Sequence, residues 1–518
     1  MIPTGTAAGR YSELQTTRSP FLERARECAK LTIPSLVPPD GHTGSSKLYK
    51  PYQGIGARGV NNLASKLLLA LLPPNSPFFR LTIDDFTLDR MSDQKGMRAE
   101  VEKALSKIER AVMNEVEAMA LRVPIFEAAK QLIVAGNVLL YVPTKGPARV
   151  FRLDRFVVKR DVAGNVLEIV VKEDVAPGSL PERARALVKK EAGKEQNTDA
   201  SVSLYTHVVR EEGRWSVYQE VAGHRVPGTG GTYPLDKCPW RPLRMIAVDG
   251  EDYGRAYVEE YIGDLISLEG LMKSVVEGAA AAAKVLFLVK PNGTTRAKTL
   301  AEAPNGAIRE GDSNDVSVLQ VDKFADFRVA RDTITDITNR LSFAFLLNSA
   351  IQRNGERVTA EEVRYMAGEL EDALGGIYSL LSQDLQLPLV ELLMWRMQRT
   401  NRLPSLPKGT VRPTIVTGVE ALGRGHDLNK LDTFLAGARD TLGPEVVAQY
   451  VDISDYLTRR AAALGIDTEG LIRSQEEVAQ AAQQQQQMAL MERVAPNAVN
   501  AFGQAAVENM KQQGTADE

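Results

Sequence analysis

The spacing of apolar and polar residues predicts a helical first quarter. In one segment, Lys95–Ala120, apolar residues return every three or four positions, which is typical of a helix with one buried face. Pro20 should interrupt the first helix and Pro73-Pro74 should end the second, because proline lacks the backbone donor and clashes with the preceding turn. A polar segment rich in proline and glycine, Pro34–Gly56, separates these two helices. Helices are predicted over Ser12–Lys30, Val60–Leu72, Lys95–Ala120 and Phe126–Ala135.

The pattern then changes to a period of two. Turn residues such as Glu212-Gly213 separate short β-branched or aromatic runs. The chain is therefore predicted to be α+β up to about Gly254, with an antiparallel sheet packed on the earlier helices. The predicted strands are Asn137–Val142, Val150–Leu153, Phe156–Arg160, Val166–Lys172, Ser201–Arg210, Trp215–Val221 and Leu243–Val248.

Two helices with apolar stripes follow, over Tyr257–Ala283 and Phe324–Leu347. The first would be roughly 40 Å long at 1.5 Å per residue. Between them lie two predicted strands, Val285–Val289 and Val316–Val321, around the turn-rich segment Pro291–Asp315. Helix, small β insert and helix is the plan of a long antiparallel hairpin that carries a cap at its far end. The alanines that close the first helix suit close packing of helices and an ordinary solvent-exposed helix equally well.

The last third is predicted to be mainly helical. After the polar connection Asn348–Val358, Thr359 and Glu362 form a capping box, in which hydroxyl and carboxylate satisfy each other's backbone donors. The helix that this box opens could extend to Arg402, with kinks expected at Gly375-Gly376 and Pro388. Further predictions are a strand over Pro413–Thr417, a helix from Asp427 to Ala438, a helical Pro444–Met491 with a glutamine-rich end, and a frayed end after Pro496.

The composition narrows the class of protein. Of 518 residues, 44% are hydrophobic and 25% are charged, so the chain is globular rather than disordered. The formal charge of −3 argues against a protein that grips nucleic acid along a broad basic face, but does not exclude one that lets nucleic acid pass. Two cysteines without an export signal predict a reducing compartment and no disulfide framework. Because the apolar runs are short or interrupted by charges, we predict a soluble protein.

Few motifs indicate catalysis. Gly54-Ile-Gly56-Ala-Arg-Gly59 fits the dinucleotide pattern G-x-G-x-x-G, but a buried strand should precede that pattern, and Tyr49–Gln53 is polar and broken by proline. A glycine-rich start of a helix is the better interpretation, with a nucleotide-dependent enzyme as an alternative. The chain has no P-loop and no G-x-S-x-G string, and its histidines and cysteines lack ligand spacing. We therefore predict no enzymatic activity, no cofactor and no metal site.

Six strings of the sequence are similar to those of one family. They are GARGVNNLASKL at Gly56–Leu67, LIVAGNVLLY at Leu132–Tyr141, RLSFAF at Arg340–Phe345, GERVTAEEVRY at Gly355–Tyr365, LQLPL at Leu385–Leu389 and GVEALGRG at Gly418–Gly425. In these strings the chain resembles the portal, or head-to-tail connector, protein of short-tailed phages of the autographivirus type (podoviruses). The resemblance extends from about Tyr11 to Gly470, and the glutamine-rich end matches only in character.

The resemblance implies a helix-rich α+β portal fold with a wing, a stem, a clip and a crown, assembling as a ring of about twelve copies at one vertex of the capsid. It also implies a name for each predicted part. These are a wing (1–255 and 359–425), two stem helices (256–284 and 324–347), a clip (285–323), a tunnel loop (348–358), a crown (426–495) and a disordered tail (496–518).

The implied function is that of a DNA conduit. Terminase would drive the genome in through the ring, and the tail would attach there for ejection. The implied partners are further copies of the chain, the terminase large subunit, tail adaptor and tail tube proteins, major capsid and scaffolding proteins, internal core proteins, and double-stranded DNA in the channel. Candidates that face DNA are Asn348, Arg353, Asn354 and Arg357 in the tunnel loop. Candidates for contact with terminase and the tail adaptor are Lys290, Arg296, Lys298, Arg309, Glu310 and Asp312 in the clip.

The residues themselves leave alternatives open. Arg353 and Arg357 suit a routine exposed loop as well as a loop that faces DNA. A ring-forming capsid scaffold or an internal core protein without a role in DNA translocation is the main alternative function. The charges of the clip are mixed in sign, since Glu302 and Asp315 add to the acidic side. Such a mixture is expected for a polar contact that partners share by turns.

Overall fold

The structure, a computed structural model, describes residues 5–74, 77–83, 97–192, 201–282, 286–319, 324–347, 370, 374, 376–404, 411–415, 432–451, 453, 456–457 and 460. These residues form a helix-rich α+β fold. The chain divides into two units. The first comprises Met1–Asp84 and Ile108–Glu420, and the second comprises Asp85–Lys107 and Ala421–Glu518.

The helices predicted for the first quarter are present as α1 (Ala7–Leu31), α2 (Ile55–Leu71), α4 (Met97–Ala118) and α5 (Arg122–Ala135). Thr6 caps α1, because its hydroxyl accepts from the Gly9 amide at 3.0 Å. At the end of α5, Gly136 has a φ of 71°, a left-handed conformation that glycine adopts without strain. The predicted interruption at Pro20 is wrong, because α1 continues through it. Burial of one face of α1 against the sheet outweighs the single backbone bond that proline removes.

The strands form separate antiparallel sheets instead of the one sheet that the sequence predicts. The largest sheet has the order β4-β5-β6-β7-β8, and β9 also pairs with β7. A second has the order β10-β2-β3, and β1 pairs with β13. The bounds are β1 Phe79–Ile83, β2 Asn137–Tyr141, β3 Arg149–Phe151, β4 Phe156–Arg160, β5 Val166–Val175, β6 Val202–Glu211, β7 Arg214–Val221, β8 His224–Arg225, β9 Gly231–Pro234, β10 Trp240–Arg244 and β13 Val411–Ile415.

Two local features differ from the sequence prediction. The strand predicted over Leu243–Val248 starts earlier, at Trp240, which lies opposite Tyr141 in the register of β10 and β2. The two rings stack with their centroids 4.6 Å apart, and such aromatic cross-strand pairs stabilise a register. The helix α6 (Glu182–Ala192) was not predicted.

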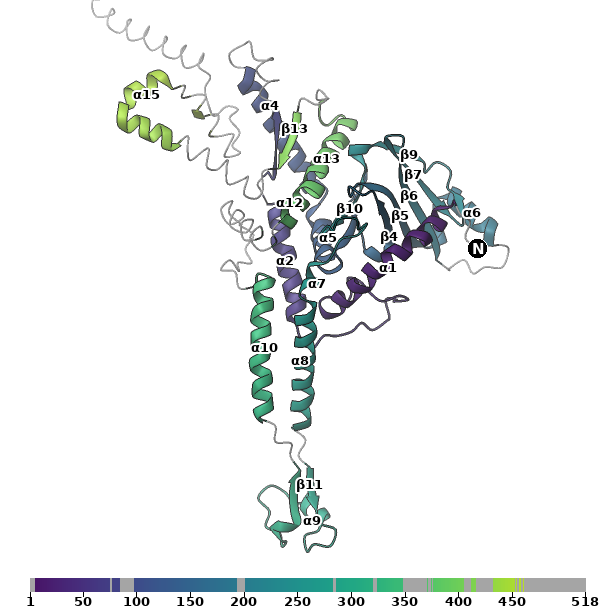
Figure 1. The fold of residues 1–518 in the computed structure, drawn as a ribbon, viewed down its shortest axis with the longest axis vertical. Coiled ribbons are helices and arrows are strands. Elements are labelled where there is room, and N and C mark those ends of the chain that lie inside the picture. Colours follow the sequence, from purple (N-terminus) through teal and green to yellow (C-terminus); the bar gives the residue numbers. More distant parts are fainter. Residues whose placement is uncertain are drawn as a thin grey trace, which may run out of the picture. The chain divides into compact units, whose positions relative to one another are not determined.

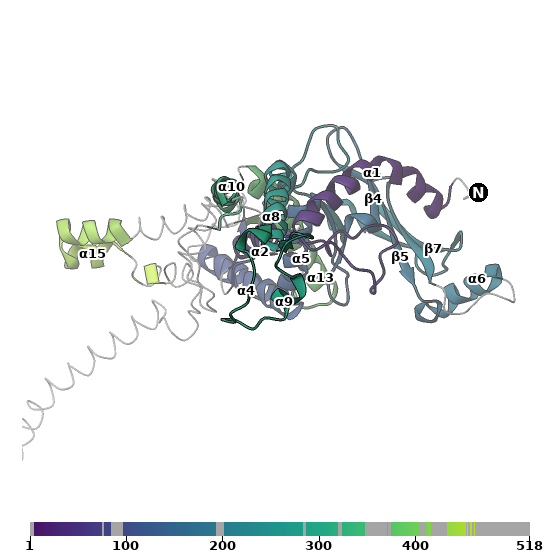
Figure 2. The ribbon, with the colours of Figure 1, turned by 90° about the horizontal axis from the view of Figure 1, so that it is seen from below.

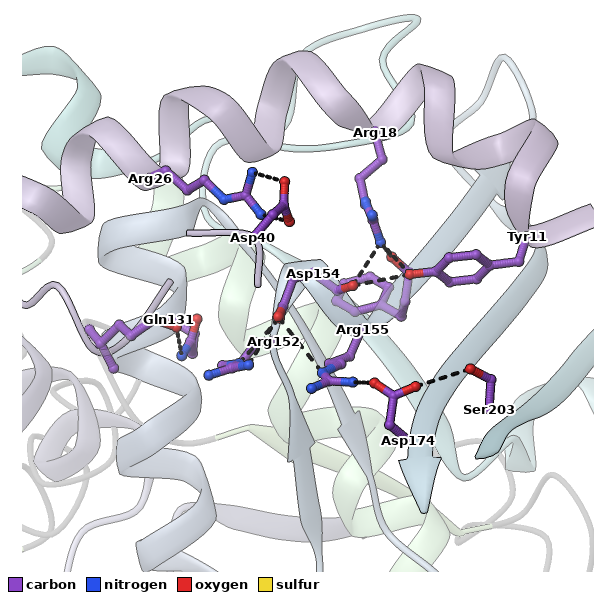
Figure 3. Close-up of polar contacts among 12 residues, drawn as sticks. Tyr11, Arg18, Arg26, Asp40, Gln131, Arg152, Asp154, Arg155, Asp174 and Ser203 are labelled. Carbon is purple, nitrogen blue, oxygen red and sulfur yellow. Dashed lines mark hydrogen bonds and ion pairs between the residues drawn. The ribbon is translucent and has the colours of Figure 1, made fainter. Parts of the chain in front are cut away.

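Helix α1 lies along one face of the six-stranded sheet (Figures 1 and 2). Figure 3 shows the polar contacts beneath it, where the buried Arg18 guanidinium points toward the start of β4. Its Nη1 donates to the Tyr11 hydroxyl at 2.7 Å and to the carbonyls of Asp154 and Phe156, each at 3.1 Å. The apolar part of this region consists of Ala7, Tyr11, Leu14, Val157, Val170 and Tyr218. We call α1, together with the face of the sheet that it covers, the α1–sheet region.

Two long helices come after β10 in the chain and run side by side (Figure 1). They are α8 (Ile262–Ala282) and α10 (Phe324–Ala344), and α8 is preceded by the short α7 (Tyr257–Glu260). Between them in the chain lie β11 (Leu286–Val289), α9 (Ala297–Ala301), the 3-10 turn η5 (Ser313–Asp315) and β12 (Val316–Leu319). Because β11 and β12 pair as an antiparallel hairpin, we call residues 286–319 the hairpin module.

The described part of the predicted helix Thr359–Arg402 contains α12 (Gly376–Leu381), a π-helical turn η6 (Ser382–Gln386) and α13 (Leu387–Arg399). Pro388 lies in the first turn of α13, where a missing backbone donor is tolerated. The Gln386 side chain donates to the Leu71 carbonyl at 2.6 Å, so the π turn is anchored to the end of α2. Thr359, Glu362 and Gly375 lie outside the described residues.

In the second unit, residues 432–442 are helical and α15 covers Pro444–Tyr450. The Tyr456 hydroxyl donates to Asp432 at 2.6 Å and accepts from Arg460 at 2.8 Å. Asp427, the glutamine-rich segment and the end after Pro496 lie outside the described residues.

Candidate functional site

Apolar contacts and an ion pair hold the paired helices α8 and α10 together. Leu265 and Leu268 on α8 and Leu341 on α10 are buried. The Arg340 guanidinium on α10 donates to the Asp264 carboxylate on α8 at 2.9 Å. The described part of the chain thus supports the antiparallel helix pair that the sequence predicts.

The segment before α2 is fastened to α8 by a buried carboxylate. Glu269 accepts from the Tyr49 hydroxyl at 2.6 Å, from the Tyr52 amide at 2.9 Å and from the Gln53 amide at 3.2 Å. The bond to this carboxylate raises the pKa of Tyr49 to about 12. The polar connection predicted over Pro34–Gly56 is therefore attached, along its last residues, to one of the paired helices.

The glycines of the G-x-G-x-x-G string allow helices to approach closely. No strand is formed by residues 48–53, which precede the string. A Cβ atom on Gly56 would lie 2.5 Å from the Leu31 carbonyl oxygen, and one on Gly59 would lie 2.5 Å from the Phe345 ring. Backbone and side chain thus fill the space that a bound pyrophosphate would need. The geometry favours the glycine-rich start of a helix over the nucleotide site.

The residues predicted to face DNA, Asn348, Arg353, Asn354 and Arg357, lie outside the described residues. The last described residue before them is Leu347, in the turn that follows α10. Their position therefore stays a prediction.

The hairpin module is held together around one carboxylate. Asp315 accepts from the Thr294 amide at 2.7 Å, the Thr294 hydroxyl at 3.2 Å and the Thr295 amide at 3.2 Å. These hydrogen bonds, with that of the Thr295 amide first, hold the pKa of Asp315 below its ordinary value. A Cβ atom on Gly293 would lie 2.4 Å from the same carboxylate, so glycine is required there. The Thr295 hydroxyl also accepts from the Asp312 amide at 2.9 Å.

The six residues predicted to contact terminase and the tail adaptor are all exposed on the hairpin module. Among the described residues, no side-chain hydrogen bond joins any two of them. Asp315, which the sequence adds to the acidic side of this surface, is instead buried and structural. The six residues are Lys290, Arg296, Lys298, Arg309, Glu310 and Asp312.

Sequence reasoning missed three polar residues that organise this part of the molecule: Glu269, Asp315 and Lys66. For Lys66 a signal was available, because it stands in the apolar run Leu63–Leu72 and a buried charge requires partners. Glu269 and Asp315 carry no such signal, since their partners lie in segments distant in the sequence or inside turns.

The described residues show no group of three or more His, Cys, Asp or Glu side chains that could hold a metal ion. In the same part of the chain, no helix combines the length and apolar character needed to cross a membrane. Both cysteines are free and buried, and burial raises the pKa of Cys28 to about 12 and that of Cys238 to about 11.

Known proteins resemble this chain over nearly its whole length. Residues 4–472 match the family described as bacteriophage head to tail connecting protein. The portal protein of Escherichia phage T7 is 47% identical over 489 residues, which cover 93% of this chain and 90% of the T7 protein. The portal protein of Enterobacteria phage T3 is 46% identical, with 91% and 89% covered, and that of Enterobacteria phage SP6 is 32% identical, with 94% of each covered.

A more distant likeness exists to a solved structure described as the neck of a native GTA particle computed with C12 symmetry. The identity is 13% and the TM-score 0.34, over 80% of this chain and 90% of that chain. The family match, by contrast, includes the paired helices, the hairpin module and the predicted tunnel loop. The chain therefore belongs to the family of bacteriophage head-to-tail connecting proteins, and is a component of the virion at the portal vertex.

Proposed function

We propose that about twelve copies of the chain close into a ring at one vertex of the capsid and that duplex DNA passes through its centre. The terminase large subunit drives the genome inward through this ring, and the tail adaptor later occupies the same outer end for ejection. In this proposal α8 and α10 form the stem, the hairpin module is the clip, residues 348–358 are the tunnel loop, residues 1–255 with 359–425 are the wing, and residues 426–495 are the crown.

The observation that carries the proposal is the helix pair α8 and α10 with the hairpin module between them. A cyclic ring requires heterologous contacts, in which one patch of each copy meets a different patch of the next. Large apolar side chains stand exposed on both helices, namely Ile266 on α8 and Val329 and Phe343 on α10, and Phe343 is 79% exposed. Exposed apolar side chains along a paired rod suit packing between neighbouring copies.

The charge of the chain suits passage of DNA rather than attachment. Each contact of Lys or Arg with a phosphate strengthens binding in a salt-dependent way, so a conduit should make few of them. The net charge of −3 agrees with this requirement. A small number of basic residues in the tunnel loop, Arg353 and Arg357, would then touch the DNA backbone transiently.

The hairpin module suits a docking surface that two partners use in turn. Its six candidate residues are exposed, and their charges are of both signs. Ile308, in the same module, is 99% exposed. A polar rim around a small apolar contact is typical of transient interfaces.

Electron microscopy of the purified protein tests the ring. We expect rings with an axial channel wide enough for duplex DNA, roughly 20 Å or more, and a native mass of roughly 680 kDa for about twelve copies of 56.7 kDa. Solitary subunits in assembled particles would contradict the proposal. A closed disc without a channel would favour a capsid scaffold or internal core protein.

Replacement of Arg353 and Arg357 by Ala tests the tunnel loop. Ring assembly should be unchanged, while the yield of packaged DNA or its retention in particles should fall, because transient phosphate contacts are lost. Loss of ring assembly would mean that the two residues are structural.

Removal of three clip cations tests the docking surface. The triple variant Arg296→Ala, Lys298→Ala and Arg309→Ala should form rings but bind the terminase large subunit more weakly. A matched control removes three exposed cations elsewhere, at Lys145, Arg210 and Arg214. Equal terminase binding by the two triple variants would contradict the proposal that the hairpin module is the clip.

A further inference from the structure

The end of α10 has a hydrogen-bond partner for each carbonyl from Leu341 to Leu346. Helices leave their last carbonyls without intrahelical partners, and these groups need donors from turns, side chains or water. Here the turn after α10 supplies three donors from its own backbone. The Phe345 amide donates to the Leu341 carbonyl at 2.9 Å, the Leu347 amide to Ser342 at 2.8 Å, and the Leu346 amide to Phe343 at 3.0 Å.

Side chains from two other helices supply the remaining donors. All of these contacts are buried or partly buried, and they come from α2 and α7. The Tyr257 hydroxyl donates to the Ala344 carbonyl at 2.8 Å, the Asn62 amide to the carbonyls of Phe345 and Leu346 at 3.0 Å each, and the Lys66 ammonium to the Leu346 carbonyl at 3.2 Å.

One face of α2 receives this end of α10. Gly59, Asn62 and Lys66 are spaced three and four residues apart, so they lie along the same side of the helix. Gly59 has no side chain where the Phe345 ring packs, and Lys66 is only 5% exposed. A cation at a helix C-terminus also interacts favourably with the helix dipole. We call Gly59, Asn62 and Lys66 the latch.

The latch holds a strained backbone. Leu346 has a φ of 54°, in the left-handed region that leucine rarely adopts. Such a conformation persists where surrounding contacts over-determine it. The two donors on the Leu346 carbonyl provide such contacts, and they fix the direction in which the chain leaves α10 at Leu347.

We propose that Asn62 and Lys66 are positioning residues that fix the root of the tunnel loop, so that retention of DNA in the particle depends on the latch. This inference rests on the proposed function, because it assumes that residues 348–358 face DNA. The latch acts on that loop through the backbone of Leu346 and Leu347 and does not touch DNA itself.

The experiment compares rings of the wild-type full chain with rings of four variants, one of which is the single variant Lys66→Met. The double variant Asn62→Ala and Lys66→Met removes the latch donors, and Lys66→Arg keeps a cationic donor. The control is Asn61→Ala, which makes the same change at the neighbouring exposed position of α2. Native mass spectrometry measures ring assembly, hydrogen exchange measures the amides of Leu346 and Leu347, and particles carrying each ring are scored for DNA retained after mild heating.

The double variant should form rings, should exchange the amides of Leu346 and Leu347 about tenfold faster, and should retain less DNA, as expected for the loss of such hydrogen bonds. Asn61→Ala should change none of these, and Lys66→Arg should restore most of the retention lost in Lys66→Met alone. Wild-type exchange or wild-type retention in the double variant would overturn the inference. If the double variant fails to form rings, the test uses Lys66→Met alone. Lower DNA retention in Lys66→Met than in Lys66→Arg would then support the inference, and equal retention would overturn it.

Failure of the proposed function gives a different result. If the Arg353→Ala and Arg357→Ala variant retains and packages DNA like the wild type, the tunnel loop does not contact DNA, whatever the latch variants do. If that variant loses DNA while the latch variants keep it, the proposed function stands and the latch is overturned.

Discussion

The α1–sheet region and the hairpin module are built by opposite means. In the first, α1 buries apolar side chains against the sheet, and the Arg18 guanidinium donates to three acceptors beneath the helix. In the second, Phe287 is 61% exposed and Ile308 fully so, and a single carboxylate, Asp315, joins the turns. The first region obtains its stability from its own core. The second has little core and exposes large side chains, an arrangement that suits the docking role proposed for it.

The largest effect is expected from Phe156→Ala on β4, which neighbours Val157 of the α1–sheet region but points to the other face of the sheet. Phe156 is fully buried on β4, and removal of such a ring costs about 3–5 kcal/mol because a cavity remains. The thermal transition of the first unit should move to a lower temperature. A transition within a degree of the wild type would mean that the buried core behind β4 does not stabilise the first unit.

Acid should weaken the α1–sheet region through Glu168 on β5. Burial would raise the pKa of this carboxyl, but hydrogen bonds from His207 at 2.8 Å and from Arg10 outweigh it and hold the pKa below the ordinary 4.5. The carboxylate therefore stabilises the folded state fully above pH 4.5, and this contribution is lost as the pH falls through the lowered value. Urea unfolding from pH 7 to pH 3 should show the loss, and Glu168→Gln should flatten it. An unchanged slope in Glu168→Gln would assign the acid sensitivity to other groups.

A smaller and local effect is expected from Asp315→Asn in the hairpin module. The variant keeps the shape but loses the charge that accepts from Thr294 and Thr295. Exchange of those two amides should rise about tenfold, while the transition of the α1–sheet region stays unchanged. A shift of that transition would show that the two regions are coupled.

The smallest effect on stability is expected from Phe287→Ala, the counterpart of Phe156→Ala in the exposed hairpin. Because the ring is largely in solvent, the free energy of unfolding should change by no more than about 0.5 kcal/mol. If the hairpin module is the docking surface proposed above, binding of the terminase large subunit should nevertheless weaken. A large loss of stability would show that Phe287 packs inside the module.

The periodicity of apolar residues in the sequence was sufficient to predict α1, α2, α4, α5, α8 and α10, and the turn-rich segment between the last two indicated the β insert. It failed at Pro20, where packing outweighs the local preference against proline. It also merged the strands into one sheet, because alternation shows that a strand exists but not which strand lies next to it.

The organising contacts could not be predicted from pattern. Glu269 and Tyr49 are separated by 220 positions, and Asn62 meets Phe345 across 283. Neither the carboxylate nor the amide differs in the sequence from an exposed polar residue. The glycine string was interpreted correctly as the start of a helix, but its partner, the Phe345 ring, becomes visible only in the fold. The tunnel-loop residues stay predictions.

The pairing of β1 with β13 limits how early a newly synthesised chain can complete its fold. Thr82 and Thr414, whose hydroxyls meet at 3.0 Å in this pair, are 332 positions apart. The ribosome must therefore make most of the chain before β1 has its neighbour, and closure over such a distance is slow. Until then β1 has unpaired backbone groups along one edge, and other chains can pair with it incorrectly. A nascent chain therefore cannot complete its fold until late in synthesis, and under the proposed function truncated products should be incorporated poorly into the ring.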